Sequence, residues 1–184
     1  MPSIDADVVA FYTGRFSEDA RLRLRAHGIL ERVRTQELIA RFLPPSPAVV
    51  LDVGGGTGVH AGISRYATLM DIGSDGRLTE DVEPFVRRLH ESGEFRGDAI
   101  GFSTAYFHMP AELLQEVIDA DLNDAKVFGI EGPAGPTLRA LGTVCLEQRL
   151  EAAVRAARIV ERDPQMLAAS GHLLAVGRST VDAA

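Results

Sequence analysis

Hydrophobic positions along this chain form two patterns, a helical spacing and short continuous apolar runs typical of buried strands. Leu30, Leu38 and Phe42 follow the spacing of an amphipathic helix, and the proline-rich stretch 44–47 ends that pattern. The run 48–53 is apolar and rich in valine, and it lies between prolines and glycines, which is typical of a buried parallel strand. The pattern therefore predicts a chain of mixed helices and strands.

Helical spacing, short apolar runs and the positions of prolines and glycines indicate the remaining elements. Pro110 suits the first turn of a helix, because proline has no amide hydrogen and that position needs none. The runs 126–130 and 172–177 are short and apolar, as strands are. We expect helices that begin near Asp5 and near Ser17, and further helices at 28–42, at 78–89, from Pro110 onward and at 146–160. We expect strands at 48–53, 126–130 and 172–177. The stretch 93–101 is expected to be a loop, and 62–72 stays unassigned.

This order of elements indicates an α/β fold. The chain has 184 residues, which fits one domain with a sizeable core. We therefore expect a single domain over 1–184, with an N-terminal helical cap at 1–43 and an α/β core at 44–184.

Composition and charge exclude several classes of protein. The formal net charge of −7 argues against a general nucleic-acid binder, since phosphate contacts need a basic surface. The arginine-rich stretch 21–34 is interpreted as a solvated helix face or as an anion or RNA contact. We expect a cytoplasmic protein that does not enter membranes, because the apolar runs are short and the N-terminus has no secretory pattern. The single cysteine, Cys145, excludes an intramolecular disulfide and is interpreted as a core residue.

A glycine-rich loop follows the predicted strand 48–53. Glycines allow a tight turn and a close approach of the backbone to a ligand, and an acid at the strand end can accept a hydrogen bond. A loop of this kind between a strand and a helix can hold an anion or a carboxylate. Another nucleotide site or a structural turn would look similar. The candidate cofactor-binding residues are Asp52, Gly54, Gly55, Gly56, Thr57 and Gly58.

The pattern Asp-x-Gly-x-Gly-x-Gly at 52–58 resembles motif I of class I S-adenosylmethionine (SAM)-dependent methyltransferases. The resemblance implies SAM as the cofactor and a Rossmann-like sheet. Weaker similarities extend it over most of the chain. They cover the lead-in helix and first strand (34–51), the segment after the fifth strand (63–69), a substrate-side block (104–110), the end of the sixth strand (129–133) and the seventh strand (172–176).

The chain departs from this family directly after the loop. His60 and Ala61 lead almost at once into the block that should follow the fifth strand, so two or more βα units of the family are missing. The missing part would include the acid that binds the ribose of SAM. Asp71 is interpreted as its replacement or as an ordinary surface or capping acid. The reduced sheet implies new strand pairing, or a homodimer with exchanged elements.

Histidines supply the other candidate chemistry. His108, in the substrate-side block, is interpreted as a general base or as a structural histidine at a helix start. His60 is expected to face solvent or to reach the cofactor, and His172 to be structural. The five histidines show no metal-ligand spacing, so we expect no metal site.

The function predicted from these features is SAM-dependent methyl transfer to a small-molecule acceptor. The alternatives are a non-catalytic, oligomeric or partner-binding remnant of such an enzyme, and the same scaffold used for another reaction such as a cyclisation.

Overall fold

The computed structural model describes residues 18–43, 59–96 and 104–179. The expected helix near Asp5, the strand 48–53 and the glycine loop 52–58 lie outside these ranges. The helices are α2 (Glu18–Leu24), α3 (Ala26–Phe42), α4 (Ala67–Ser74), α5 (Glu83–Ser92), α6 (Pro110–Asp119), α7 (Gly135–Leu141) and α8 (Leu146–Val160). The strands are β1 (Val59–Ser64), β2 (Glu94–Phe95), β3 (Ala105–His108), β4 (Leu122–Gly129) and β5 (His172–Ser179), and the 3₁₀ turns are η1 (Gly132–Ala134) and η2 (Leu167–Ala169).

The strands form one mixed sheet in the order β2-β3-β1-β5-β4. β1 pairs parallel with β3 on one edge and antiparallel with β5 on the other. β5 in turn pairs antiparallel with β4. The fold is therefore α/β, and β1 has a neighbour on each side within the described chain.

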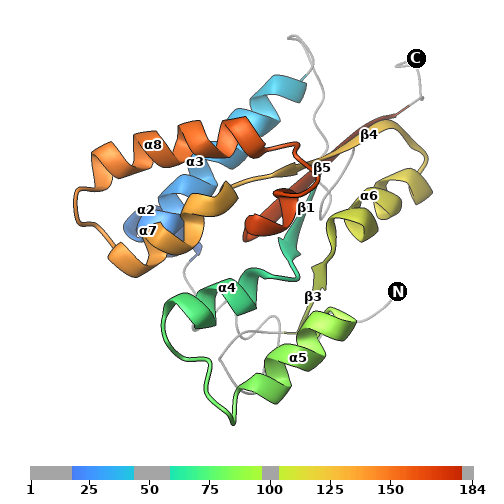
Figure 1. Cartoon of the computed structure of the whole chain (residues 1–184). Helices are drawn as coiled ribbons and strands as arrows, with labels where there is room; N and C mark the ends of the chain where they lie inside the picture. Colours follow the sequence, from blue (N-terminus) through green and yellow to red (C-terminus); the bar gives the residue numbers. More distant parts are fainter. Residues whose placement is uncertain (1–17, 44–58, 97–103, 180–184) are drawn as a thin grey trace.

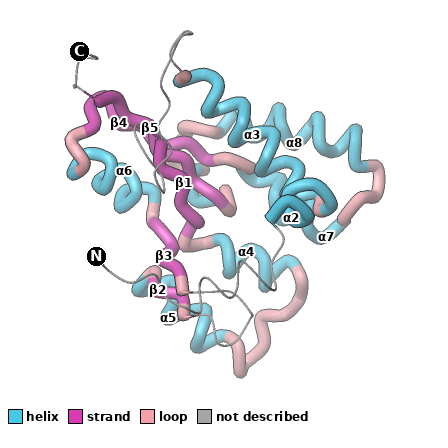
Figure 2. The backbone as a smooth tube through the Cα atoms, turned by 180° about the vertical axis from the view of Figure 1, so that it is seen from behind, coloured by secondary structure: helices cyan, strands magenta, loops and turns pink. Residues whose placement is uncertain are grey.

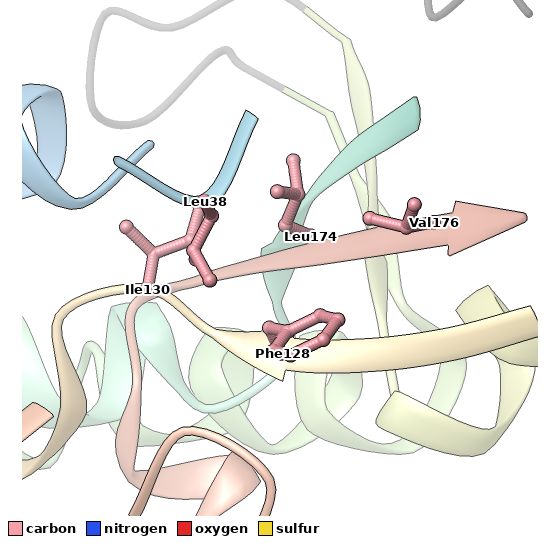
Figure 3. Packing of buried hydrophobic residues seen from close by; sticks show 5 residues of the cluster. All are labelled: Leu38, Phe128, Ile130, Leu174 and Val176. Carbon is pink, nitrogen blue, oxygen red and sulfur yellow. The ribbon is translucent and has the colours of Figure 1, made fainter. Parts of the chain in front are cut away.

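The residues of β5 cover both faces of the sheet, because successive side chains of a strand point to opposite sides. Leu174 and Val176 pack with Leu38 of α3, and Figure 3 shows this cluster together with Phe128 and Ile130. Leu173 and Ala175 pack on the other face with Leu113 and Val117 of α6. Figures 1 and 2 show the resulting layers, with α3 and α8 on one side of the sheet and α6 on the other.

Several predicted elements are confirmed closely. The helix expected at 28–42 is α3, the one expected at 146–160 is α8, and α6 begins at Pro110. The strand expected at 172–177 is β5. These segments have a long apolar period or a clear start signal, which makes them readable from sequence.

The helix predicted at 78–89 begins later, at Glu83. Pro84 lies in its first turn, where its missing amide hydrogen does no harm. The preceding residues form a turn, in which the amides of Val82 and Glu83 donate to the carbonyl of Thr79 at 3.1 and 2.9 Å. The helix ends at Gly93, whose φ of 76° is left-handed.

Other segments differ from the prediction because they are short or irregular. The unassigned stretch contains the end of β1 and α4, and β2 lies in the predicted loop 93–101. β3 has four residues, too few to show a period. β4 begins four residues before the predicted strand, and a bulge between Asn123 and Lys126 interrupts its alternation.

Two side chains contradict their sequence-based interpretation. Arg34, assigned to a solvated helix face, is fully buried, and it donates to the carbonyl of Ile130 at 3.3 Å and to Glu161 at 2.5 Å. A buried guanidinium needs such partners, and these come from segments distant in sequence. Cys145, interpreted as core, is exposed at the start of α8 with a φ of 49°.

Within the described ranges, no helix combines the length and the apolar character needed to cross a membrane.

The packing predicts that Leu174→Ala destabilises the fold strongly. Leu174 is 1% exposed, so removal of its methyl groups leaves a cavity, and we expect the free energy of unfolding to fall by about 2–5 kcal/mol. The matched control is Leu24→Ala, because Leu24 is 72% exposed. Urea unfolding followed by circular dichroism measures both. Equal effects of the two substitutions would contradict this packing.

Candidate functional site

His108 is the last residue of β3, and only Met109 separates it from Pro110, the first residue of α6. Its side chain is 11% exposed, and its Nε2 lies 3.2 Å from Oε1 of Glu116 on α6. The imidazole ring of His108 thus lies between the sheet and α6.

His60, on β1, reaches the same carboxylate. Its Nε2 lies 3.1 Å from Oε2 of Glu116, and its ring meets that of His108 edge to face with centroids 5.8 Å apart. The structure therefore brings together His60, His108 and Glu116, which we call the two-histidine cluster. The side chain of His60 is 33% exposed and also contacts Glu116 and His108, so the expectation that His60 faces solvent is only partly right.

Strand register explains why these residues meet. His60 is paired with Ala175 and Gly62 with Leu173, so both residues of β1 face α6, as Leu173 and Ala175 do. His108 is paired with Ser64, which lies on the same face of β1. Gly62 leaves space for the His108 ring, because a Cβ at Gly62 would lie 2.9 Å from its Nδ1.

Burial keeps His108 neutral near pH 7. Burial lowers the pKa of His108, and this effect exceeds the opposing attraction of Glu116, while the neighbouring His60 lowers it further. Its Nδ1 is buried and has no hydrogen-bond partner within the described residues. The neutral ring can accept a proton or bind a cation.

Arg65 fixes the segment that carries His108. The Arg65 amide donates to the His108 carbonyl at 2.9 Å. Its guanidinium donates to the carbonyl of Phe107 at 3.2 Å and to Glu112 at 2.6 Å. Glu112 also accepts the amide hydrogen of Met109 at 2.8 Å, so β3 and α6 are joined by one partly buried network.

The other predicted site residues lie elsewhere. The six residues of the glycine loop, from Asp52 to Gly58, are outside the described ranges. Asp71 lies inside α4, where its carboxylate is 3.0 Å from Nη1 of Arg139. An acid in a helix with an arginine partner matches the ordinary interpretation of Asp71, and it is not at a strand end as a ribose ligand would be.

A second polar cluster joins Glu131, His172 and Ser170 beneath α3. The carboxylate of buried Glu131 accepts from the Ser170 hydroxyl at 2.7 Å and from the His172 amide at 2.9 Å, and it contacts the His172 ring. Burial alone would lower the pKa of His172, but Glu131 and the nearby Glu31 raise it to about 9. Burial is likewise overcome at Glu131, whose pKa is lowered mainly by His172. The pair is charged at pH 7, which agrees with a structural role for His172.

An open cavity of about 400 Å³ lies beside the start of α3 and the end of α7, away from the two-histidine cluster. Arg25, His27 and Arg139 are among its lining residues, together with Asp75, which pairs with Arg139 at 3.3 Å. Burial and then the charges of Arg139 and Arg25 lower the pKa of His27 to about 4, and the ring is neutral at pH 7. None of the cluster residues lines this cavity.

Comparisons of the chain with protein-family models, with curated proteins and with solved structures found no match. The resemblance to class I methyltransferases therefore stays a prediction that rests on the sequence motifs.

The pKa of His172 predicts an alkaline loss of stability. Because this pKa in the folded chain exceeds the ordinary value of 6.5, the stabilisation is complete below pH 6.5 and is lost as the pH rises through about 9. We expect the free energy of unfolding to fall over this window by up to about 3 kcal/mol. Urea unfolding at several pH values should show this fall in the wild type and in His90→Gln, but not in His172→Gln. An unchanged fall in His172→Gln would contradict the assignment.

Proposed function

We propose that this chain is a SAM-dependent methyltransferase that acts on a small-molecule acceptor, with the two-histidine cluster at its substrate side. The observation that carries the proposal is the position of His60. It follows Gly58 by two residues, a stretch of chain that spans at most about 7 Å, and its ring touches that of His108. A cofactor held by the glycine loop would thus lie near the proposed base.

The strand order supports the proposal. In a complete class I sheet the sixth and seventh strands lie beyond the fifth. Here β1 leads into the segment 63–69, which resembles the one after the fifth strand, and β5 and β4 lie beyond it in the sheet. On the other edge of β1, β3 occupies the place that a missing strand would take.

The proposed reaction needs alignment more than acid–base power. SAM supplies a methyl group on a positively charged sulfur. When bound, SAM would transfer this methyl group to a nitrogen, oxygen or carbon of the acceptor, and the electron pair of the broken carbon–sulfur bond would stay on sulfur. His108 takes the proton that the acceptor loses, and Arg65 and Glu112 keep the histidine in place.

A second candidate, a non-catalytic scaffold that forms a homodimer or binds a partner, is favoured by one observation. Class I enzymes place the loop between a strand and a helix, whereas here the residue after Gly58 begins β1. The loop therefore has no helix amino terminus directly behind it to hold a cofactor carboxylate. Light scattering after size exclusion would separate a homodimer from a monomer.

The proposal predicts that the chain binds SAM through its glycine loop. Calorimetric titration of SAM and of S-adenosylhomocysteine should give one site with micromolar affinity. The matched variant Gly56→Arg should lose this binding, because a long side chain fills the space beside the backbone. No binding by a folded sample of verified mass would overturn the methyltransferase proposal and leave the scaffold as the better candidate.

The role of His108 predicts a loss of turnover without a loss of cofactor affinity. In His108→Gln the side chain keeps hydrogen-bonding atoms but accepts no proton at pH 7. We expect kcat to fall by roughly 10²–10⁴-fold on any acceptor that the wild type methylates, with SAM affinity unchanged. Transfer of labelled methyl groups to a panel of phenols, carboxylates and amines would measure this, with His90→Gln as the control. Full activity of His108→Gln would exclude the base.

A further inference from the structure

We propose that His60, His108 and Glu116 form a binding site for one zinc ion. Each residue offers one ligand atom, and the three atoms lie within 4.8 Å of one another. The carboxylate oxygens are 3.1 Å and 3.2 Å from the two Nε2 atoms. Around a tetrahedral zinc with bonds of 2.0–2.2 Å, neighbouring ligand atoms are about 3.3–3.6 Å apart. Small side-chain shifts would therefore admit the ion.

The fold presets two of the three ligands. β1 and β3 are neighbours in one sheet, and His60 and His108 face the same side of it. The His108 ring lies against Gly62, where a Cβ would be 2.9 Å from its Nδ1, and the side chain is 11% exposed. A ligand that is already immobile loses little entropy when the ion binds.

The third ligand and the entry path are on the surface. Glu116 is 47% exposed and His60 is 33% exposed, whereas His108 is 11% exposed. An ion can enter from solvent at Glu116 and reach the buried imidazole behind it. Three protein ligands would leave a fourth position for water, the arrangement found at zinc sites that are open to other molecules.

The chemistry of the donors favours zinc among the common divalent ions. Two imidazole nitrogens and one carboxylate oxygen suit zinc and its neighbours in the transition series, whereas magnesium and calcium prefer oxygen ligands only. The carboxylate also neutralises part of the charge of the ion, which lowers the cost of placing it beside the sheet.

The cluster of Glu31, Glu131 and His172 meets the same distance criterion but not the chemical one. The carboxylate of Glu131 is already engaged by the Ser170 hydroxyl and by the amide and ring of His172. A metal there would have to break this buried network and remove the proton that His172 holds at pH 7. In the two-histidine cluster only contacts with Glu116 would be exchanged.

Zinc bound to His108 would compete with the proton that the methyl-transfer proposal gives to this histidine. Binding of zinc is therefore tested in the absence of SAM, so that failure of either proposal leaves the other intact.

The test is calorimetric titration of zinc chloride into the untagged chain. All samples carry Cys145→Ser, because an exposed thiol can bind zinc on its own. We expect one ion per chain. His60→Ala and Glu116→Gln should each weaken binding roughly tenfold or more, while Asp119→Asn on the same helix and His90→Gln should not. Circular dichroism verifies that each variant is folded.

Cobalt provides a second measurement. Cobalt bound at the site should give the visible absorption of a four-coordinate ion, and zinc should abolish it. The proposal is overturned if the parent chain binds no zinc, or if His60→Ala and Glu116→Gln bind it as tightly as the parent.

Discussion

The structure depends on β5, a strand that is paired along both edges and packed against α3 on one face and α6 on the other. β1 and β4 attach to its edges, while α3 covers Leu174 and Val176 and α6 covers Leu173 and Ala175. Four consecutive apolar residues are required because neither face of the strand meets water. The next residue, Gly177, has no room for a side chain, since a Cβ there would lie 2.6 Å from that of Leu122. Both layers of helices are thus held in place through one strand.

The geometry of the two-histidine cluster is a consequence of this packing. α6 is held on the sheet by Leu113 and Val117, and Glu116 precedes Val117 on the helix. The pairing of β1 with β5 turns His60 toward the same helix. The side chains that could do chemistry therefore lie at the rim of a close-packed core, where backbone positions are well fixed.

Sequence reasoning recovered the elements with strong local signals and missed those that depend on distant partners. The apolar period of 146–160 and the proline at 110 define their helices without help from the rest of the fold. The four residues of β3 form a strand because β1 and β2 lie beside them. Arg34 looked like a surface residue because its partner Glu161 is far away in the sequence. The sequence likewise gives no indication that His60 and His108 meet, because strand register cannot be read from their spacing along the chain.

The choice between the proposed enzyme and the proposed scaffold depends on whether a glycine-rich loop that is followed directly by a strand can hold SAM. In the proposed enzyme, glycines would let the backbone approach SAM, and the carboxylate of Asp52 would accept a hydrogen bond from its ammonium group. The aligned dipoles of a helix, worth about 0.3–1 kcal/mol to an anion, are absent directly behind Gly58, where β1 begins. Asp71 lies inside α4 beside Arg139, not at a strand end, where the proposed enzyme would need a ribose-binding acid. Leu173, Leu174, Ala175 and Val176 pack against α3 and α6, so the proposed scaffold draws its stability from this core, whereas the proposed enzyme also needs the loop to hold SAM.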